Sequence, residues 1–188
     1  MSDQPVSVSP TKGFTLPRDC VVTIVPAGHR ITLAQGDRVT VLQALGGTAT
    51  VTTSDGEMAR LTPEDSVEFG FVDAADRPQV PNDEPFSVER VWEAATTVYD
   101  PEIPVDIVEL GLVYRVDATE LPSGGWRVDI DMSVTAPFCG MGDILRQDLH
   151  DAVAALNGVA EVDVKLVLDP PWDVSRLSDV ARLELGMM

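Results

Sequence analysis

The period at which apolar residues recur changes along the chain, and the second half carries the clearest patterns. Every second residue is apolar from Trp126 to Val134, which is the period of a half-buried β-strand. From Ile144 to Leu156 the apolar residues recur at three- and four-residue spacing, which predicts an amphipathic helix that ends at Asn157-Gly158. A strand therefore gives way to a helix across residues 135–143.

The other elements of the second half follow from the same two periods. They are a helix that begins after Ser87 and ends before Asp100-Pro101, strands over 105–116 (interrupted at Gly111) and 162–168, and a helix over 175–185. The resulting order of helix, strand, strand, helix, strand, helix predicts an α/β sandwich over residues 86–188, with helices packed on a three-stranded sheet.

The first half contains short β-rich runs between glycine-rich turns. These runs are residues 20–25, 29–33, 38–42 and 48–53, and no helical period is visible between Leu16 and Val72. We expect a small antiparallel β domain over 14–73. Residues 74–85, which are rich in proline and acidic side chains, are expected to be a linker, and the predicted fold class is α+β.

The charge balance limits the partners. The 31 acidic residues against 13 lysines and arginines give a net charge of −18, which disfavours binding to nucleic acid or to anionic membranes and favours basic proteins or cations. The alternative is that the acidic surface only keeps the protein in solution. The sequence has no run long enough to span a membrane and no start typical of a signal peptide, so we expect a cytoplasmic protein.

Cys139 lies in the segment that joins the predicted strand to the predicted helix. The free N–H groups and the dipole at a helix start favour the thiolate, which attacks electrophiles or binds soft metals. The alternative is a small buried apolar residue, and the residues alone leave both interpretations open. Cys20 lies in an apolar run and should be packed, whereas His29 follows a turn and should be exposed; with no third ligand near them, a zinc site is not supported.

The segment from Asp100 to Pro104 is predicted to be a rigid turn that presents the carboxylates of Asp100 and Glu102. If strand ends and helix starts gather, these carboxylates meet Cys139. Two carboxylates and one thiolate suit transient binding of ferrous iron or of an iron–sulfur cluster edge, although one cysteine cannot hold a cluster alone. The alternative is local: Asp100 caps the turn and Glu102 is solvated.

Three segments, in order, resemble the iron–sulfur assembly and targeting factors that include bacterial SufT. They are DPEIPVDIVELGLVY (100–114), TAPFCGMG (135–142), and PPWD (170–173) with Ala181-Arg182. Pro26-Ala27-Gly28 and Leu45-Gly46-Gly47 are similar to the extra N-terminal region of SufT proteins. Gly140 follows the cysteine where shorter members often have proline, which fits the SufT branch.

The resemblance implies an auxiliary role in maturing iron–sulfur proteins, without turnover of a substrate. Cys139 would be the functional residue and transient ligand of iron or a cluster, supported by Asp100, Glu102 and Thr135. The implied partners are the assembly machinery, client apoproteins and a second copy, because a homodimer could bring two Cys139 thiolates together. Trp172 is expected to pack in the core.

Two alternatives from other classes remain. A cysteine enzyme, such as a thiol hydrolase or peroxidase, needs a general base near Cys139. The sequence offers only His29 and His150, and His150 is expected on the solvated face of its helix. The other alternative is a protein-interaction adaptor whose cysteine is structural.

Overall fold

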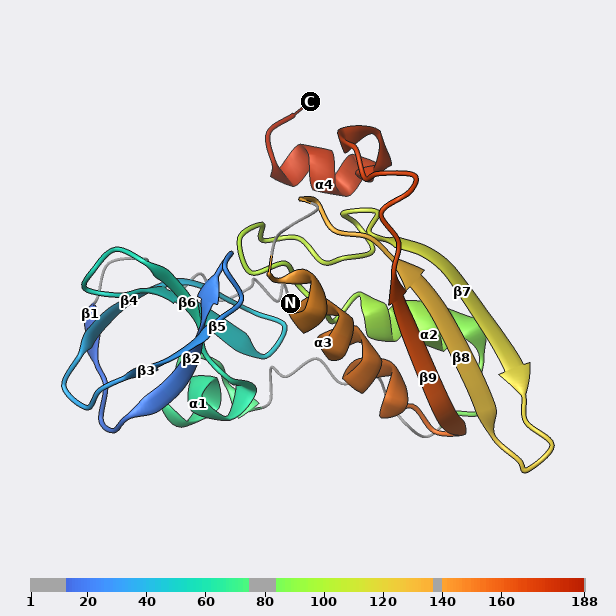
Figure 1. Ribbon diagram of the computed structural model, residues 1–188, viewed down its shortest axis with the longest axis horizontal. Helices are drawn as coiled ribbons and strands as arrows, with labels where there is room; N and C mark the ends of the chain where they lie inside the picture. Colours follow the sequence, from blue (N-terminus) through green and yellow to red (C-terminus); the bar gives the residue numbers. More distant parts are fainter. Residues whose placement is uncertain (1–12, 75–83, 137–139, 188) are drawn as a thin grey trace, which may run out of the picture. The chain divides into compact units, whose positions relative to one another are not determined.

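The computed structural model describes residues 13–74, 84–136 and 140–187, which form two compact units (Figure 1). The N-terminal unit contains strands β1 to β6 and helix α1, and the C-terminal unit contains α2 to α4 and β7 to β9. Among these described residues, every helix is too short or too polar to cross a membrane. The α+β class is confirmed, while residues 75–83 of the predicted linker at 74–85 lie outside the described residues.

The N-terminal unit is built on a six-stranded antiparallel sheet. Its strands are β1 (Gly13–Thr15), β2 (Cys20–Val25), β3 (Arg30–Leu33), β4 (Arg38–Leu45), β5 (Thr48–Thr52) and β6 (Met58–Arg60), in the spatial order β1-β4-β5-β6-β2-β3. The apolar positions of these strands form one core, in which Cys20 is buried as predicted. His29 is exposed, also as predicted.

One expectation for this unit is wrong. The sequence shows no helical period between Leu16 and Val72, but the structure has helix α1 (Pro63–Glu68) there. The helix is only six residues long, so it shows less than two turns of pattern. Its signal is at the start: the Thr62 side chain accepts a hydrogen bond from the Asp65 amide, and Pro63 occupies the first turn. Capping chemistry of this kind identifies a helix that is too short for periodicity.

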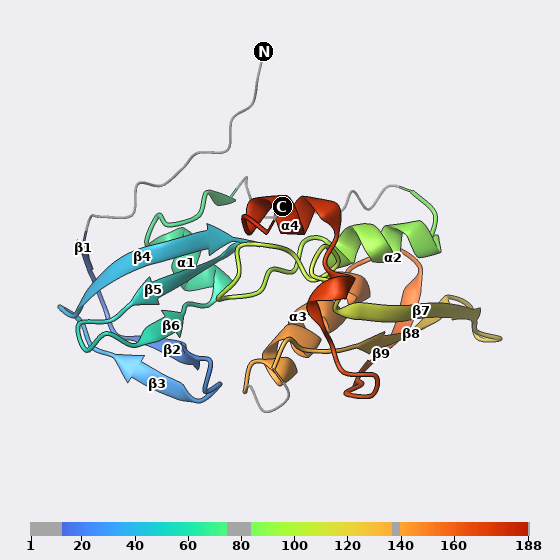
Figure 2. The same ribbon diagram turned by 90° about the horizontal axis from the view of Figure 1, so that it is seen from above.

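The C-terminal unit packs two helices on one face of a three-stranded sheet (Figures 1 and 2). Its elements are α2 (Val88–Ala95), β7 (Val113–Glu120), β8 (Trp126–Met132), α3 (Gly142–Ala154), β9 (Val159–Leu166), the 3-10 helix η2 (Val174–Arg176) and α4 (Asp179–Glu184). Strand β8 is central, antiparallel to β7 and parallel to β9. The Ser87 hydroxyl caps α2 by accepting a hydrogen bond from the Arg90 amide at 3.4 Å.

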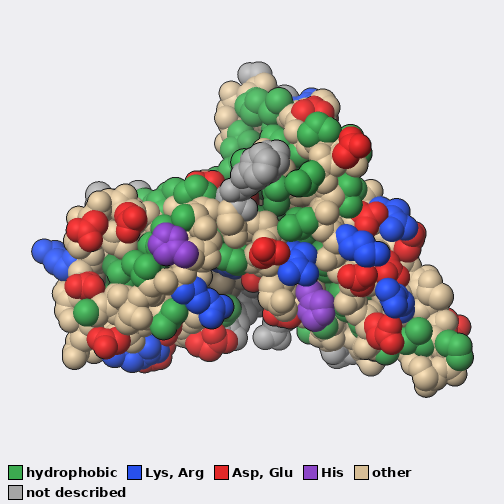
Figure 3. Space-filling view, in the orientation of Figure 1, with side chains coloured by type: hydrophobic (Ala, Val, Ile, Leu, Met, Phe, Trp, Pro, Cys, Tyr) green, Lys and Arg blue, Asp and Glu red, His purple; other side chains and the backbone are tan. Residues whose placement is uncertain are grey.

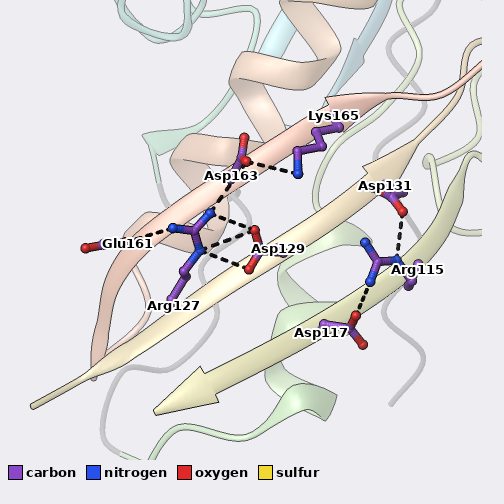
Figure 4. A network of polar contacts seen from close by, with 8 residues as sticks. All are labelled: Arg115, Asp117, Arg127, Asp129, Asp131, Glu161, Asp163 and Lys165. Carbon is purple, nitrogen blue, oxygen red and sulfur yellow. Dashed lines mark hydrogen bonds and ion pairs between the residues drawn. The ribbon is translucent and has the colours of Figure 1, made fainter. Parts of the chain in front are cut away.

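The alternating pattern of β8 divides its side chains between the two faces of this sheet. Val128, Ile130 and Met132 are buried against the helices, where they meet Leu145 and Leu149 of α3. The intervening residues lie on the open face, which carries a network of ion pairs (Figure 4).

Arg127 is the centre of that network. Its guanidinium lies 3.0 Å from Asp129, 3.4 Å from Glu161 and 3.8 Å from Asp163, while Arg115 on β7 pairs with Asp131 at 2.7 Å (Figure 4). These side chains are partly exposed, so water screens the pairs and each adds little to stability. The network gives the open face a solvated, charged surface and leaves the buried face to hold the unit together.

The predicted strand over 105–116 is wrong in its first part. Strand β7 begins only at Val113, and residues 105–112 form turns that bury Val105, Ile107, Leu110 and Leu112. The turn is held by Asp106, whose carboxylate accepts hydrogen bonds from the amides of residues 108 and 109 at 2.9 and 3.0 Å. The apolar composition predicted burial correctly, but burial does not require a strand.

The chain after β9 packs back onto these turns. The Trp172 indole N–H donates to the Leu110 carbonyl at 2.7 Å, and its ring packs against the core, which confirms its predicted place. The predicted last helix at 175–185 is two pieces, η2 and α4. Ser178 caps α4 by accepting a hydrogen bond from the Ala181 amide, and it also donates to the Glu109 carboxylate.

Candidate functional site

The loop that follows α2 is organised by Asp100. Its carboxylate oxygen Oδ1 accepts hydrogen bonds from the amides of Glu102 at 2.8 Å and Ile103 at 3.0 Å. The backbone closes the loop as well, because the Asp100 amide donates to the Val105 carbonyl at 3.3 Å. Asp100 is therefore buried and structural in part, and Glu102 is the carboxylate that this turn exposes.

Because Asp100 Oδ1 accepts these two hydrogen bonds, replacing the carboxylate should lower the stability of the C-terminal unit. We expect Asp100→Ala to lower the free energy of unfolding by about 1–3 kcal/mol, because two amides lose their acceptor. Asp100→Asn keeps Oδ1 and should lose less than half as much. Urea unfolding followed by tryptophan fluorescence measures this difference, since Trp92, Trp126 and Trp172 all belong to the C-terminal unit. Equal losses in the two variants would contradict the assigned hydrogen bonds.

The end of β8 and the start of α3 form the facing part of the site. Ser133 and Val134 are buried beyond the strand end, Thr135 is half-buried and Ala136 is exposed. Helix α3 then begins at Gly142, and the Met141 side chain before it makes no capping hydrogen bond. The start of α3 is therefore the positive end of a thirteen-residue helix dipole, and Met141 supplies no side-chain oxygen to cap it.

Gly142 sets how closely α3 approaches the sheet. A Cβ atom at this position would lie 3.2 Å from Val134 Cγ1 and 3.3 Å from Leu166 Cδ1, which is tighter than ordinary packing contact. The absence of a side chain thus lets the helix start sit directly against the ends of β8 and β9.

These elements surround a hollow in the C-terminal unit. Residues 26–28 belong to this unit as well, and the hollow is lined by Pro26, Ala27, Asp100, Pro101, Glu102, Val134, Thr135, Ala136, Met141 and Leu145. Three residues singled out from the sequence, Asp100, Glu102 and Thr135, thus line the same hollow. Cys139, the residue expected to do the chemistry, lies outside the described residues, between Ala136 and Gly140.

The electrostatics of the hollow favour cations. Partial burial raises the pKa of the Glu102 carboxyl, and the neighbouring Asp100 charge raises it further. Outside the hollow, burial likewise raises the pKa of Asp106, and this outweighs the lowering by the hydrogen bonds that its carboxylate accepts from two amides. A cation in the hollow would relieve the repulsion between the carboxylates of Asp100 and Glu102.

The raised pKa of Glu102 predicts a pH-dependent effect on stability. The folded protein holds this proton more tightly than the unfolded chain, so ionised Glu102 lowers stability as pH rises from its ordinary pKa of 4.5 through the folded value. Glu102→Gln should therefore unfold at higher urea concentration than the wild type at pH 7, with the two proteins converging below pH 4.5. A difference that is the same at both pH values would contradict this origin.

The position of His150 gives little support to a general base in the hollow. His150 lies in the third turn of α3, about 12 Å along the axis from the helix start, and its Nδ1 is 3.0 Å from the Asp151 carboxylate. His150 is half-buried rather than fully solvated.

Cys20 is a packing residue of the N-terminal unit, and burial raises the pKa of its thiol.

Sequence reasoning missed the apolar wall of the hollow and one buried polar atom. Met141 and Leu145 are buried at the start of α3, and only knowledge of where the helix begins would have assigned them to the lining. The Ser133 hydroxyl is buried and finds no hydrogen-bond partner among the described residues. In the same described part of the chain, no three histidine, cysteine or acidic side chains are grouped to hold a metal ion.

Comparison with known proteins identifies the family. A model of the iron–sulfur cluster assembly protein family matches residues 88–164, which lie within the C-terminal unit. An Fe–S protein maturation auxiliary factor of Porphyromonas gingivalis is 40% identical over 100 residues, which are 53% of this chain and 91% of the relative.

Two further relatives carry the same description. The Fe–S protein maturation auxiliary factor YitW of Bacillus subtilis is 36% identical over 99 residues, 53% of this chain and 93% of its own. The Fe–S protein maturation auxiliary factor SufT of Staphylococcus aureus is 32% identical over 90 residues, 48% of this chain and 98% of its own. This chain is thus similar to these relatives along nearly their whole length, and it belongs to the iron–sulfur cluster assembly protein family as a SufT-type member.

Proposed function

We propose that this protein is an auxiliary factor in the maturation of iron–sulfur proteins, which assists assembly of a cluster or its transfer to client apoproteins in the cytoplasm. The observation that carries the proposal is the similarity to three Fe–S protein maturation auxiliary factors, at 32–40% identity. The family match includes the Asp100 turn and the start of α3, which supply most of the lining of the hollow.

In this proposal Cys139 is the ligand that contacts the iron of the cargo. Its place just before α3 favours the thiolate, because the helix start is the positive end of the dipole. The exposed carboxylate of Glu102 supplies a hard oxygen ligand for ferrous iron, while Asp100 holds the turn that carries it. Thr135 lines the same hollow.

One thiolate leaves the remaining coordination positions of a cluster open. A stable cluster is usually held by four cysteine thiolates, so the cargo must be shared with small thiols, a partner protein or Cys139 of a second copy. We propose a homodimer or a complex with the assembly machinery as the loaded state. Incomplete coordination suits a carrier, since the cluster must leave again.

The proposal assigns no enzymatic turnover to this protein. The relatives are named auxiliary factors, and His150 lies too far along α3 to act directly as a base at the helix start. A cysteine hydrolase or peroxidase would need such a base or a stabilising cation beside the thiol.

Removal of the gene from its host tests this function. We expect the activity of iron–sulfur enzymes to fall while the amounts of their polypeptides stay unchanged, and a plasmid copy of the wild-type gene to restore the activity. The control is an enzyme without a cluster, whose activity should not change. Unchanged activity of the iron–sulfur enzymes in the deletion strain, or an equal fall in both kinds of enzyme, would refute the proposal.

A further inference from the structure

The end of the chain carries an apolar surface on the C-terminal unit. Eight large apolar side chains stand out as exposed among the described residues, and two of them, Val21 and Leu42, belong to the N-terminal unit. The other six belong to the last part of the chain, and we call them the C-terminal apolar surface: Leu166, Leu168, Val174, Val180, Leu183 and Met187. Figure 3 shows apolar side chains gathered over this region, around α4.

Helix α4 is apolar on its outer side as well as on its inner side. On the inner side, Ala181 of α4 is buried in the core of the unit, as is Leu177 just before the helix. Val180 and Leu183 point outward, with 56% and 66% of their surfaces exposed. A helix that only covers a core presents polar side chains to water, and clustered exposed apolar residues usually mark an interaction site.

The C-terminal apolar surface reaches the start of α3. Leu166, at the end of β9, belongs to this surface, and its Cδ1 would lie 3.3 Å from a Cβ on Gly142. Gly142 is the first residue of α3, next to the hollow lined by Met141 and Leu145. A protein bound to this surface would therefore be close to the site where the cargo is handled.

The charges around this surface are mainly acidic. Its exposed carboxylates are Asp169, Asp173, Asp179 and Glu184. The two arginines of the segment are engaged within the unit. Arg176 stacks on the Tyr114 ring at 3.8 Å. Arg182 donates to the Ser175 carbonyl at 3.1 Å and lies 3.8 Å from Asp179, so it offsets one of the four carboxylates. A second copy would bring the same carboxylates and a net charge of −18, so the charge favours a basic partner.

We propose that the C-terminal apolar surface docks a protein segment whose apolar side chains are flanked by lysines or arginines. The segment belongs to a partner that delivers or receives the cluster. The role given to this partner rests on the proposed function, whereas the binding itself does not.

A binding experiment with the full chain tests the docking surface directly. The probe is a fluorescent amphipathic helical peptide with leucines on one face and lysines on the other, and its anisotropy reports binding. Val180→Ser/Leu183→Ser should weaken binding by about tenfold or more. Leu42→Ser, the same kind of change at an exposed residue of the N-terminal unit, should leave it unchanged. Equal affinity in the wild type and the double variant would overturn the proposal.

Two controls separate the partner's chemistry from other causes. A peptide with glutamates in place of the lysines should bind at least about tenfold more weakly; equal binding of both peptides would refute the basic flank. Sedimentation equilibrium identifies the other occupant: a wild-type dimer that the double variant converts to a monomer would assign the surface to a second copy and overturn the proposal.

A failure here is distinguishable from a failure of the proposed function. The peptide assay contains no iron, so it is independent of whether Cys139 binds a cluster. In the deletion strain, the double variant should restore iron–sulfur enzyme activity less well than Leu42→Ser at equal protein amounts. Equal restoration by the two variants would show that the C-terminal apolar surface takes no part in cluster delivery, and it would not bear on the function proposed for the hollow.

Discussion

Replacing Cys139 with alanine is expected to abolish the ability of this protein to restore iron–sulfur enzyme activity in cells that lack it. Cys139 is the only thiol of the C-terminal unit, and carboxylates alone are poor ligands for cluster iron. The activity of a cluster-dependent enzyme in the complemented deletion strain, corrected for the amount of its polypeptide, measures the effect.

The matched control for this variant is Cys20→Ala. Cys20 is a buried packing residue of the N-terminal unit, so its replacement removes a thiol of the same chain without touching the hollow. It should restore activity about as well as the wild type. Restoration by Cys139→Ala at the level of Cys20→Ala would mean that the protein acts as an adaptor with a structural cysteine.

The largest effect on folding is expected from Gly111→Ala. Gly111 has φ of +67°, and a Cβ there would lie 2.3 Å from the Arg176 carbonyl oxygen. The left-handed conformation alone costs roughly 1–2 kcal/mol for alanine, and the clash with backbone must move η2 away from the turn. We expect a loss of about 3 kcal/mol or more in the free energy of unfolding.

Gly124→Ala separates these two contributions. Gly124 has φ of +89°, but a Cβ there would meet nothing within 4 Å, so its cost should be about 1–2 kcal/mol. Urea unfolding followed by tryptophan fluorescence compares the variants in the C-terminal unit. Equal losses would mean that η2 does not pack against Gly111 as closely as the structure has it.

The sequence predicted the elements whose period is sustained. Strand β8 could be assigned because its apolar side chains recur at every second residue along the whole strand. Helix α3 could be assigned because its apolar side chains recur every three to four residues over several turns. The turns at 105–112 could not be separated from a strand, because a buried loop has the same apolar composition. The hydrogen bonds of Asp106 and the left-handed Gly111 determine that local structure.

The hollow was predictable only in outline. The break in period at residues 135–143 located one wall, and Asp100-Pro101 located the other. That Asp100 would be buried, with Oδ1 accepting from two amides, depends on how the loop folds back, and no spacing encodes it. The C-terminal apolar surface was missed for a related reason, since a helical pattern predicts a buried face and says nothing of a second apolar face.

Anaerobic reconstitution of the purified protein tests the central claim most directly. The reduced protein is incubated with ferrous iron and sulfide and desalted, and its visible absorption and bound iron are measured. We predict that the wild type and Cys20→Ala acquire both the absorption and the iron, and that Cys139→Ala acquires neither. Equal iron and equal absorption in Cys139→Ala would contradict the assignment of Cys139 as the ligand of the cluster.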